Sequence, residues 1–184
     1  ALDVSFTSGR SKEVKWARNP GDGSGNWRVF PIGSFPEADW PDRCEVGDLN
    51  ADGRVDVIVT EENSGGGPDA LACWWEQPAA DPTNPHWTRH TIARQFTMNN
   101  LDLADVDQDG DVDLVLAEHR GTRRIAVWEN DGRGNFTERR IDEGHESHLG
   151  GRLADLDADG DLDLVSIAYD EFAKVHLWRN DNVP

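Results

Sequence analysis

Apolar and polar residues alternate with a period of two along short stretches of this chain, and the 3.6-residue period of an amphipathic helix is absent. Residues 101–105 read LDLAD, in which leucine alternates with polar or small residues before an acidic turn. Further short apolar or alternating stretches, separated by polar turns, cover residues 112–116, 125–128 and 136–141. Such stretches are typical of strands. The pattern therefore predicts four short antiparallel strands between residues 101 and 141.

The same order of features recurs along the chain at intervals of roughly fifty residues. An acidic loop opens at Asp48, Asp105 and Asp155. A tryptophan follows each loop at Trp75, Trp128 and Trp178, and Trp16 is interpreted as an earlier member of this set. An aromatic residue after the next turn stands at Trp27, Trp87 and Phe136. We predict a single segment built from repeats at residues 1–33, 34–93, 94–142 and 143–184.

Each acidic loop has the form D-x-[DN]-x-D-G-x-x-D, namely DLNADGRVD, DVDQDGDVD and DLDADGDLD. Carboxylates this close repel one another unless a cation lies among them, and the glycine permits the sharp bend that a hard-cation loop needs. The sequence therefore predicts structural Ca²⁺ sites in all three loops. The predicted ligands are the side chains at positions 1, 3, 5 and 9 with the carbonyl at position 7: Asp48, Asn50, Asp52, Arg54 and Asp56; Asp105, Asp107, Asp109, Asp111 and Asp113; Asp155, Asp157, Asp159, Asp161 and Asp163.

Other interpretations of these loops fit less well. An EF-hand would need a bidentate Glu at position 12, where the loops have Val59, Leu116 and Ser166. A dockerin continues as a helix, which VDVIVT does not favour. Acidic turns without metal stay an alternative, and Mg²⁺ is disfavoured because it seldom takes an all-protein oxygen cage. Asn50 lowers the charge of the first loop, so we expect that site to be the weakest.

The repeats resemble the FG-GAP/VCBS family of calcium-loop repeats, found in integrin α-chains and many secreted bacterial proteins. The resemblance rests on VGDLNADGRVDVIVTE, ADVDQDGDVDLVLAE and LADLDADGDLDLVSIA, and it covers residues 2–182. It implies an all-β fold of four-stranded antiparallel β-propeller blades, with the metal loop between the first and second strands of each blade. It also implies that binding uses the opposite face and that the propeller commonly has seven blades.

The phase of the repeat leaves two possibilities open. Residues 2–4 align with 55–57, so the first repeat starts at its second strand, and the last repeat stops after its third. The chain thus provides about three and a half blades. Either it is a fragment of a longer propeller, or copies self-associate to complete a ring and cover open edges.

Composition narrows the class of partner. Lys and Arg number 18 against 36 Asp and Glu, and the net charge of −18 argues against nucleic acid or an anionic membrane. No apolar run reaches the length of a membrane span, and Ala1 opens directly into polar sequence, so neither a span nor a signal peptide is expected. Cys44 and Cys73 are predicted to be free thiols. Because weak calcium sites fill only near millimolar calcium, we expect an extracellular or periplasmic, bacterial setting.

The connections on the face opposite the metal loops provide the candidates for function. The candidate ligand-binding residues are Trp40, Glu61, Arg120, Arg123 and His145. A mixture of aromatic, guanidinium and carboxylate groups suits a glycan or a protein ligand. The rival hypothesis is a polysaccharide lyase or sugar dehydratase, with His148, His119 and Tyr169 as acid–base candidates. A third is a self-assembling structural repeat protein. We expect a binding module rather than an enzyme.

Overall fold

The computed structural model describes residues 2–37, 39–64, 67–145, 149–168 and 174–181, and the statements below concern those residues. They form fourteen strands: β1 (Val4–Ser8), β2 (Glu13–Arg18), β3 (Arg28–Ser34), β4 (Trp40–Gly47), β5 (Asp56–Glu62), β6 (Ala70–Glu76), β7 (Thr88–Gln95), β8 (Met98–Ala104), β9 (Asp113–Glu118), β10 (Ile125–Asn130), β11 (Phe136–Asp142), β12 (Leu149–Ala154), β13 (Asp163–Ile167) and β14 (Val175–Trp178). The predicted all-β fold is confirmed. Within this part of the chain, no helix is long and apolar enough to cross a membrane.

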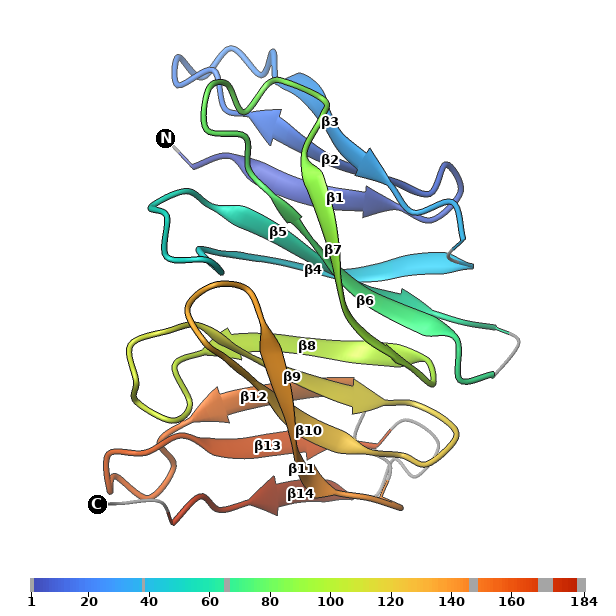
Figure 1. Ribbon diagram of the computed structural model, residues 1–184, viewed down its shortest axis with the longest axis vertical. Helices are drawn as coiled ribbons and strands as arrows, with labels where there is room; N and C mark the ends of the chain where they lie inside the picture. Colours follow the sequence, from blue (N-terminus) through green and yellow to red (C-terminus); the bar gives the residue numbers. More distant parts are fainter. Residues whose placement is uncertain (1, 38, 65–66, 146–148, 169–173, 182–184) are drawn as a thin grey trace.

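The strands form four antiparallel sheets in chain order. The first sheet is β1-β2-β3, the second β4-β5-β6-β7, the third β8-β9-β10-β11 and the fourth β12-β13-β14. Figure 1 shows them stacked face to face, from the first sheet at the top to the fourth at the bottom. Every hairpin joins neighbouring strands, which is the connectivity of propeller blades. The predicted grouping of strands into three, four, four and three is therefore confirmed.

Alternation along each middle strand lets one sheet pack on two neighbours. In β5, Val57 and Val59 lie in a buried cluster shared with the first sheet, whereas Ile58 lies in a cluster shared with the third. In β9, Leu114 packs toward the second sheet and Val115 toward the fourth. The side chains of a strand point to opposite faces in turn, so a run of apolar residues supplies both interfaces.

The register of the first sheet corrects one landmark of the repeat. Val4 and Val57 are equivalent positions of the repeat. Val57 pairs with Trp75, whereas Val4 pairs with Ala17. Trp16 therefore corresponds to Trp74, not to Trp75, and the prediction that it belongs to the tryptophan set was wrong by one position. A shift of one residue turns a side chain to the other face, and Trp16 accordingly packs toward the second sheet, where its Nε1 donates to the Pro82 carbonyl oxygen (3.2 Å).

Candidate metal loops and ligand groove

The three acidic loops connect the first and second strands of the last three sheets, and they lie together at the left edge of Figure 1. They share a backbone conformation, because φ is positive at the fourth and the sixth residue of each. The pairs are Ala51 and Gly53 (55° and 82°), Gln108 and Gly110 (63° and 98°), and Ala158 and Gly160 (63° and 101°). Glycine adopts this left-handed region readily, which explains its recurrence at the sixth position.

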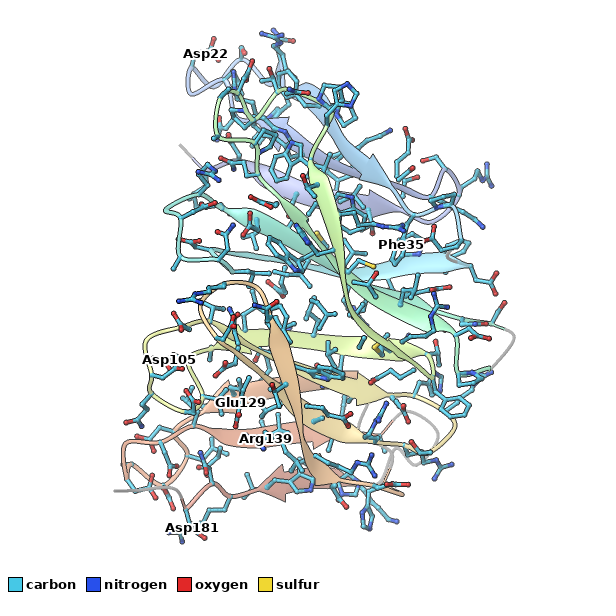
Figure 2. The ribbon with its side chains drawn as sticks, in the orientation of Figure 1. Asp22, Phe35, Asp105, Glu129, Arg139 and Asp181 are labelled. Carbon is cyan, nitrogen blue, oxygen red and sulfur yellow. The ribbon has the colours of Figure 1, made fainter. Side chains whose placement is uncertain are left out.

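This conformation turns the first, third and fifth side chains inward. Ligand oxygens of Asp105, Asp107 and Asp109 all lie within 4.8 Å of one another, and those of Asp155, Asp157 and Asp159 do the same. Figure 2 places Asp105 on the loop at the edge of the molecule. Carboxylates this close repel one another, and a bound cation would offset that repulsion.

Buried oxygen atoms without a hydrogen-bond partner support a fit to Ca²⁺. Asn50 Oδ1 and Asp105 Oδ1 are buried and accept no hydrogen bond. They stand at the third position of the first loop and the first position of the second. A buried acceptor without a partner is costly, and calcium coordination would satisfy both atoms. The donor sets of the loops thus fit calcium.

The ninth residue of each loop has a second role that needs no metal. Asp113 is fully buried, and its carboxylate accepts the backbone N–H of Val106 (2.8 Å) and of Asn130 (2.9 Å). Asp56 and Asp163 bind two backbone N–H groups in the same way. Burial raises the pKa of Asp113 and raises that of Asp56 to about 6. These carboxylates join the loop to the end of the third strand of the sheet.

Arginines reach two of the three loops. The guanidinium of Arg54 forms an ion pair with Asp52 inside the first loop. In the third loop, Arg179 Nε lies 2.9 Å from the Asp157 carboxylate. Among the described residues, no ion pair to a cationic side chain involves the second loop. A bound arginine competes with a metal ion for the same oxygens, so the second loop has the ligand set most open to calcium.

The described candidate residues on the opposite edge differ in exposure and in their contacts. Arg120 and His145 are exposed, Arg123 is half-buried, and His145 Nδ1 lies 2.9 Å from the Asp142 carboxylate. His119 is only 6% exposed. His148 and Tyr169 lie outside the described residues. Of the three acid–base candidates, His119 alone lies among the described residues, and it is buried.

Glu61 is removed from the ligand set because its carboxylate binds the backbone. It is 2% exposed, and its two oxygens accept the N–H groups of Asp39 (2.7 Å) and Leu71 (3.0 Å). Glu118, at the equivalent position of the third sheet, is fully buried and accepts from the backbone of Arg124 (3.2 Å). Both carboxylates stabilise the turn between the second and third strands of their sheet.

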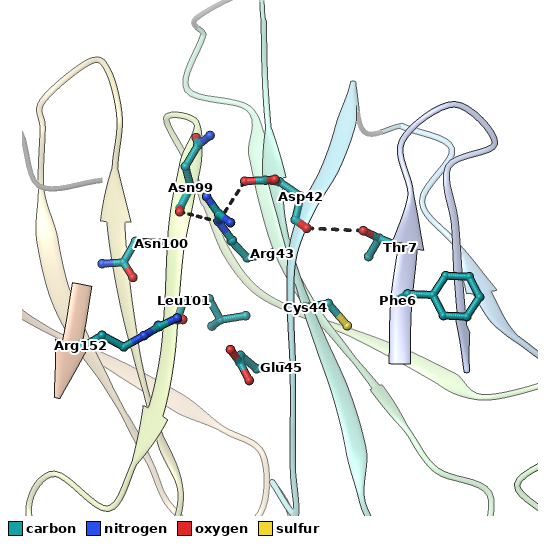
Figure 3. Close-up of a pocket in the computed structure, with 10 residues that line it drawn as sticks. All are labelled: Phe6, Thr7, Asp42, Arg43, Cys44, Glu45, Asn99, Asn100, Leu101 and Arg152. Carbon is teal, nitrogen blue, oxygen red and sulfur yellow. Dashed lines mark hydrogen bonds and ion pairs between the residues drawn. The ribbon is translucent and has the colours of Figure 1, made fainter. Parts of the chain in front are cut away.

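Trp40, in contrast, is exposed and begins a strand that lines a groove along the innermost strands, although its own side chain packs against Gly9. It begins β4 and is 53% exposed. The groove has a volume of about 500 Å³ and runs between β1, β4, β8 and β12. Its polar lining includes Asp42, Arg43, Glu45, Asn99, Asn100 and Arg152. Figure 3 shows side chains from these separate strands meeting there.

Backbone contacts hold the two arginines of the groove in place. Arg43 Nε donates to the Asn99 carbonyl oxygen (2.8 Å) and lies 3.3 Å from the Asp42 carboxylate. Arg152 Nη1 donates to the Leu101 carbonyl oxygen (3.2 Å). Figure 3 shows both guanidinium groups bridging neighbouring strands. Burial raises the pKa of Asp42 and of Glu45, which is the expected effect of a partly desolvated groove.

Two adjacent amides leave hydrogen-bonding capacity unused in this groove. Asn100 is 1% exposed, and neither its Oδ1 nor its Nδ2 has a partner; Asn99 is 8% exposed, and its Oδ1 has none. Most buried polar groups in proteins are satisfied. The two asparagines line the groove beside guanidinium and carboxylate groups, and their unpartnered atoms are buried beneath its surface, with the Asn100 amide packed against Gly151.

Sequence reasoning missed Glu45, Asn100 and Arg152. Aligning the repeats on the first loop aspartate places Glu45, Asp102 and Arg152 at one position, three residues before the loop. That position is charged in every repeat but changes sign, unlike the apolar positions beside it. This variation between repeats was the available signal for a specialised surface.

Comparison with known families agrees with this geometry. A family profile for the FG-GAP-like repeat matches residues 1–59 and 105–166, which together make up more than half of the chain. The chain belongs to the FG-GAP-like repeat family, and the predicted resemblance is confirmed. A search of curated proteins found no match.

Proposed function

We propose that this chain is a calcium-stabilised binding module, in which the acidic loops hold Ca²⁺ structurally and the groove along the inner strands binds a hydroxyl-rich ligand such as a glycan. Two features of the same fold, the acidic loops and the groove, carry the proposal. Convergent loop carboxylates stand at one edge, and buried amides without partners line a groove along the strands. Weak calcium sites fill near millimolar calcium, so an extracellular or periplasmic setting, in a bacterium, belongs to the same proposal.

The contacts of the loops support an order of calcium affinity. The second loop has three inward aspartates and no ion pair to arginine, the third has Arg179, and the first has both Asn50 and Arg54. We expect affinity to fall in that order. Calcium binding should raise the free energy of unfolding by about 2.7 kcal/mol for each site at a concentration one hundred times its Kd.

Thermal unfolding and isothermal titration calorimetry test the calcium part. The Tm should rise in millimolar Ca²⁺, rise less in Mg²⁺, and fall when EDTA is added. Asp107→Asn should weaken the tightest site, and Asn50→Asp should strengthen the weakest. A Tm that is the same in calcium and in EDTA would contradict structural calcium.

The groove provides the ligand part of the proposal. Three acids, Asp42, Glu45 and Asp102, stand near two arginines, so the groove disfavours a polyanion and favours a neutral ligand. Trp40 is half exposed at the start of β4, a strand that lines the groove, and its indole ring offers a surface on which a sugar ring can stack. The unpartnered amide of Asn100, which is buried beside the groove, would bind ring hydroxyls after a change of its side-chain rotamer.

Glycan-array screening followed by calorimetry tests this part, with Asn100→Leu as the decisive variant. Removing an unpartnered buried amide should leave the free protein as stable as before or more stable, yet abolish glycan binding. Trp40→Ala should weaken binding, while His145→Ala, which lies outside the groove, should leave it unchanged. A blank array, or binding that survives Asn100→Leu, would exclude the groove as a glycan site.

A further inference from the structure

Two histidines and an aspartate meet between the third and fourth sheets, at the edge opposite the acidic loops. Asp142 ends β11, His145 follows it in the chain, and His176 lies in β14. The ring centroids of His145 and His176 are 5.6 Å apart. Trp178 Nε1 donates to the Asp142 carboxylate (3.0 Å), and Figure 1 shows β11 ending beside β14. The packing of two separate sheets therefore brings two imidazole rings to one place.

The hydrogen bonds of Asp142 determine which nitrogen of His145 is available to a ligand. Burial raises the pKa of Asp142, but the hydrogen bonds that the carboxylate accepts, chiefly that from Trp178, outweigh burial and hold the pKa below its usual value. The carboxylate is therefore ionised at neutral pH and can only accept hydrogen bonds. His145 Nδ1, 2.9 Å from the carboxylate, must carry the proton, which leaves the lone pair of Nε2 for a metal ion. Metal-binding histidines are commonly oriented by a carboxylate in this way.

His176 has a ring nitrogen that is buried and unpartnered. Its Nε2 makes no hydrogen bond, and its ring stacks on Trp178 with centroids 5.5 Å apart. A buried polar atom without a partner is costly, and coordination to a metal ion would satisfy it. Two imidazole rings that bind one metal ion at about 2.0–2.1 Å from each nitrogen have centroids roughly 5–6 Å apart. The separation of the His145 and His176 rings, 5.6 Å, fits that arrangement.

The repeat itself does not call for these side chains. Strand register makes Asp142 equivalent to one position of β3 and of β7, and His176 equivalent to one position of β6 and of β10. The equivalent residues are Gly33 and Ala93 at the first position, and Cys73 and Ala126 at the second. Small side chains are sufficient for the packing of sheets at both places. The carboxylate and the imidazole are therefore specific to this pair of sheets, and the fold does not explain them.

We propose that His145 and His176 bind a divalent transition-metal ion such as Zn²⁺ through Nε2 of each ring, and that Asp142 positions His145 for this role. Solvent molecules complete the coordination. Imidazole nitrogen suits zinc, copper and nickel, whereas calcium takes oxygen ligands. The histidine site and the acidic loops therefore select different ions on opposite edges of the molecule. The inference does not depend on calcium in the loops or on a ligand in the groove.

Isothermal titration calorimetry with Zn²⁺ tests the site, on protein freed of metal with EDTA and kept in millimolar Ca²⁺ so that zinc does not fill the acidic loops. One zinc ion should bind per chain. His145→Ala and His176→Ala should each abolish the heat of binding. The His145 side chain is 60% exposed, so its variant should fold with an unchanged Tm. His86→Ala is the matched control, because His86 is also exposed but lies in the connection between β6 and β7, and it should bind zinc like the parent protein.

Electron paramagnetic resonance with Cu²⁺ in place of Zn²⁺ identifies the ligands and separates the role of Asp142. The spectrum of the parent protein should show two imidazole nitrogens on the copper. Asp142→Asn keeps an oxygen that can accept from Trp178, so it should keep both nitrogens and lower zinc affinity about 10–100-fold. Absence of zinc binding in calcium would overturn the inference, as would zinc binding that survives His145→Ala. Unchanged affinity in Asp142→Asn would overturn the positioning role of that carboxylate.

Discussion

The buried aspartate at the end of each acidic loop is both a predicted metal ligand and an acceptor of backbone N–H groups. Substituting it distinguishes its contribution to metal binding from its contribution to folding. In Asp113→Ala, the backbone N–H groups of Val106 and Asn130 lose their acceptor inside the protein. Each buried N–H without an acceptor costs about 1–3 kcal/mol. The cost of burying the carboxylate, which raises its pKa, disappears at the same time. We expect a net loss of about 3 kcal/mol in the free energy of unfolding, or about 6–12 °C in Tm for a chain of this length.

The matched variant is Asp109→Ala in the same loop. Asp109 is exposed, and its carboxylate accepts one loop N–H, that of Asp111 (2.9 Å). Its loss should cost less than about 1 kcal/mol without metal. In calcium, both variants should be less stable than the parent, since both remove a predicted ligand.

Urea unfolding in EDTA is the deciding assay. Asp113→Ala should be clearly destabilised there and Asp109→Ala should unfold close to the parent protein. If the two variants unfold together in EDTA, the buried carboxylate is not a structural acceptor and the reasoning fails.

Three further predictions follow from other contacts. Arg124→Met should lower the free energy of unfolding by about 3 kcal/mol in urea unfolding, because it leaves the fully buried Glu118 without its ion partner (3.1 Å); an unchanged midpoint would show that the backbone donors suffice. Arg179→Gln should raise the calcium affinity of the third loop in calorimetry, since it frees the Asp157 carboxylate; unchanged affinity would contradict competition. Cys44 and Cys73 should react slowly with a thiol reagent in the folded protein and rapidly in urea, because burial raises the pKa of both thiols; fast native reaction would contradict their burial.

The regular features of this protein could be predicted from its sequence because they depend on neighbours along the chain. Alternation over a few residues sets a strand, and a glycine at the sixth loop position permits its positive φ. The four groups of strands and the three loop conformations follow from such local patterns. The two cysteines were also predicted to be free, and they are free in the structure, on β4 and β6, which β5 separates.

The irregular features could not be predicted because they depend on which sheets touch. A single residue of register decides the face on which Trp16 lies. Glu61 was chosen as a ligand-binding residue for its loop position, but its burial and two backbone contacts appear only in the folded turn.

The sequence by itself determined the repeat, the strands, the family and the acidic loops. The tertiary structure decided which of those loops an arginine enters, and where buried amide atoms of Asn99 and Asn100 are left without hydrogen-bond partners. The physical reason is distance along the chain. Arg179 and Asp157 are separated in sequence and meet only in the folded protein. The packing of whole sheets likewise determines which apolar side chains, such as Val4 and Leu177, are left exposed.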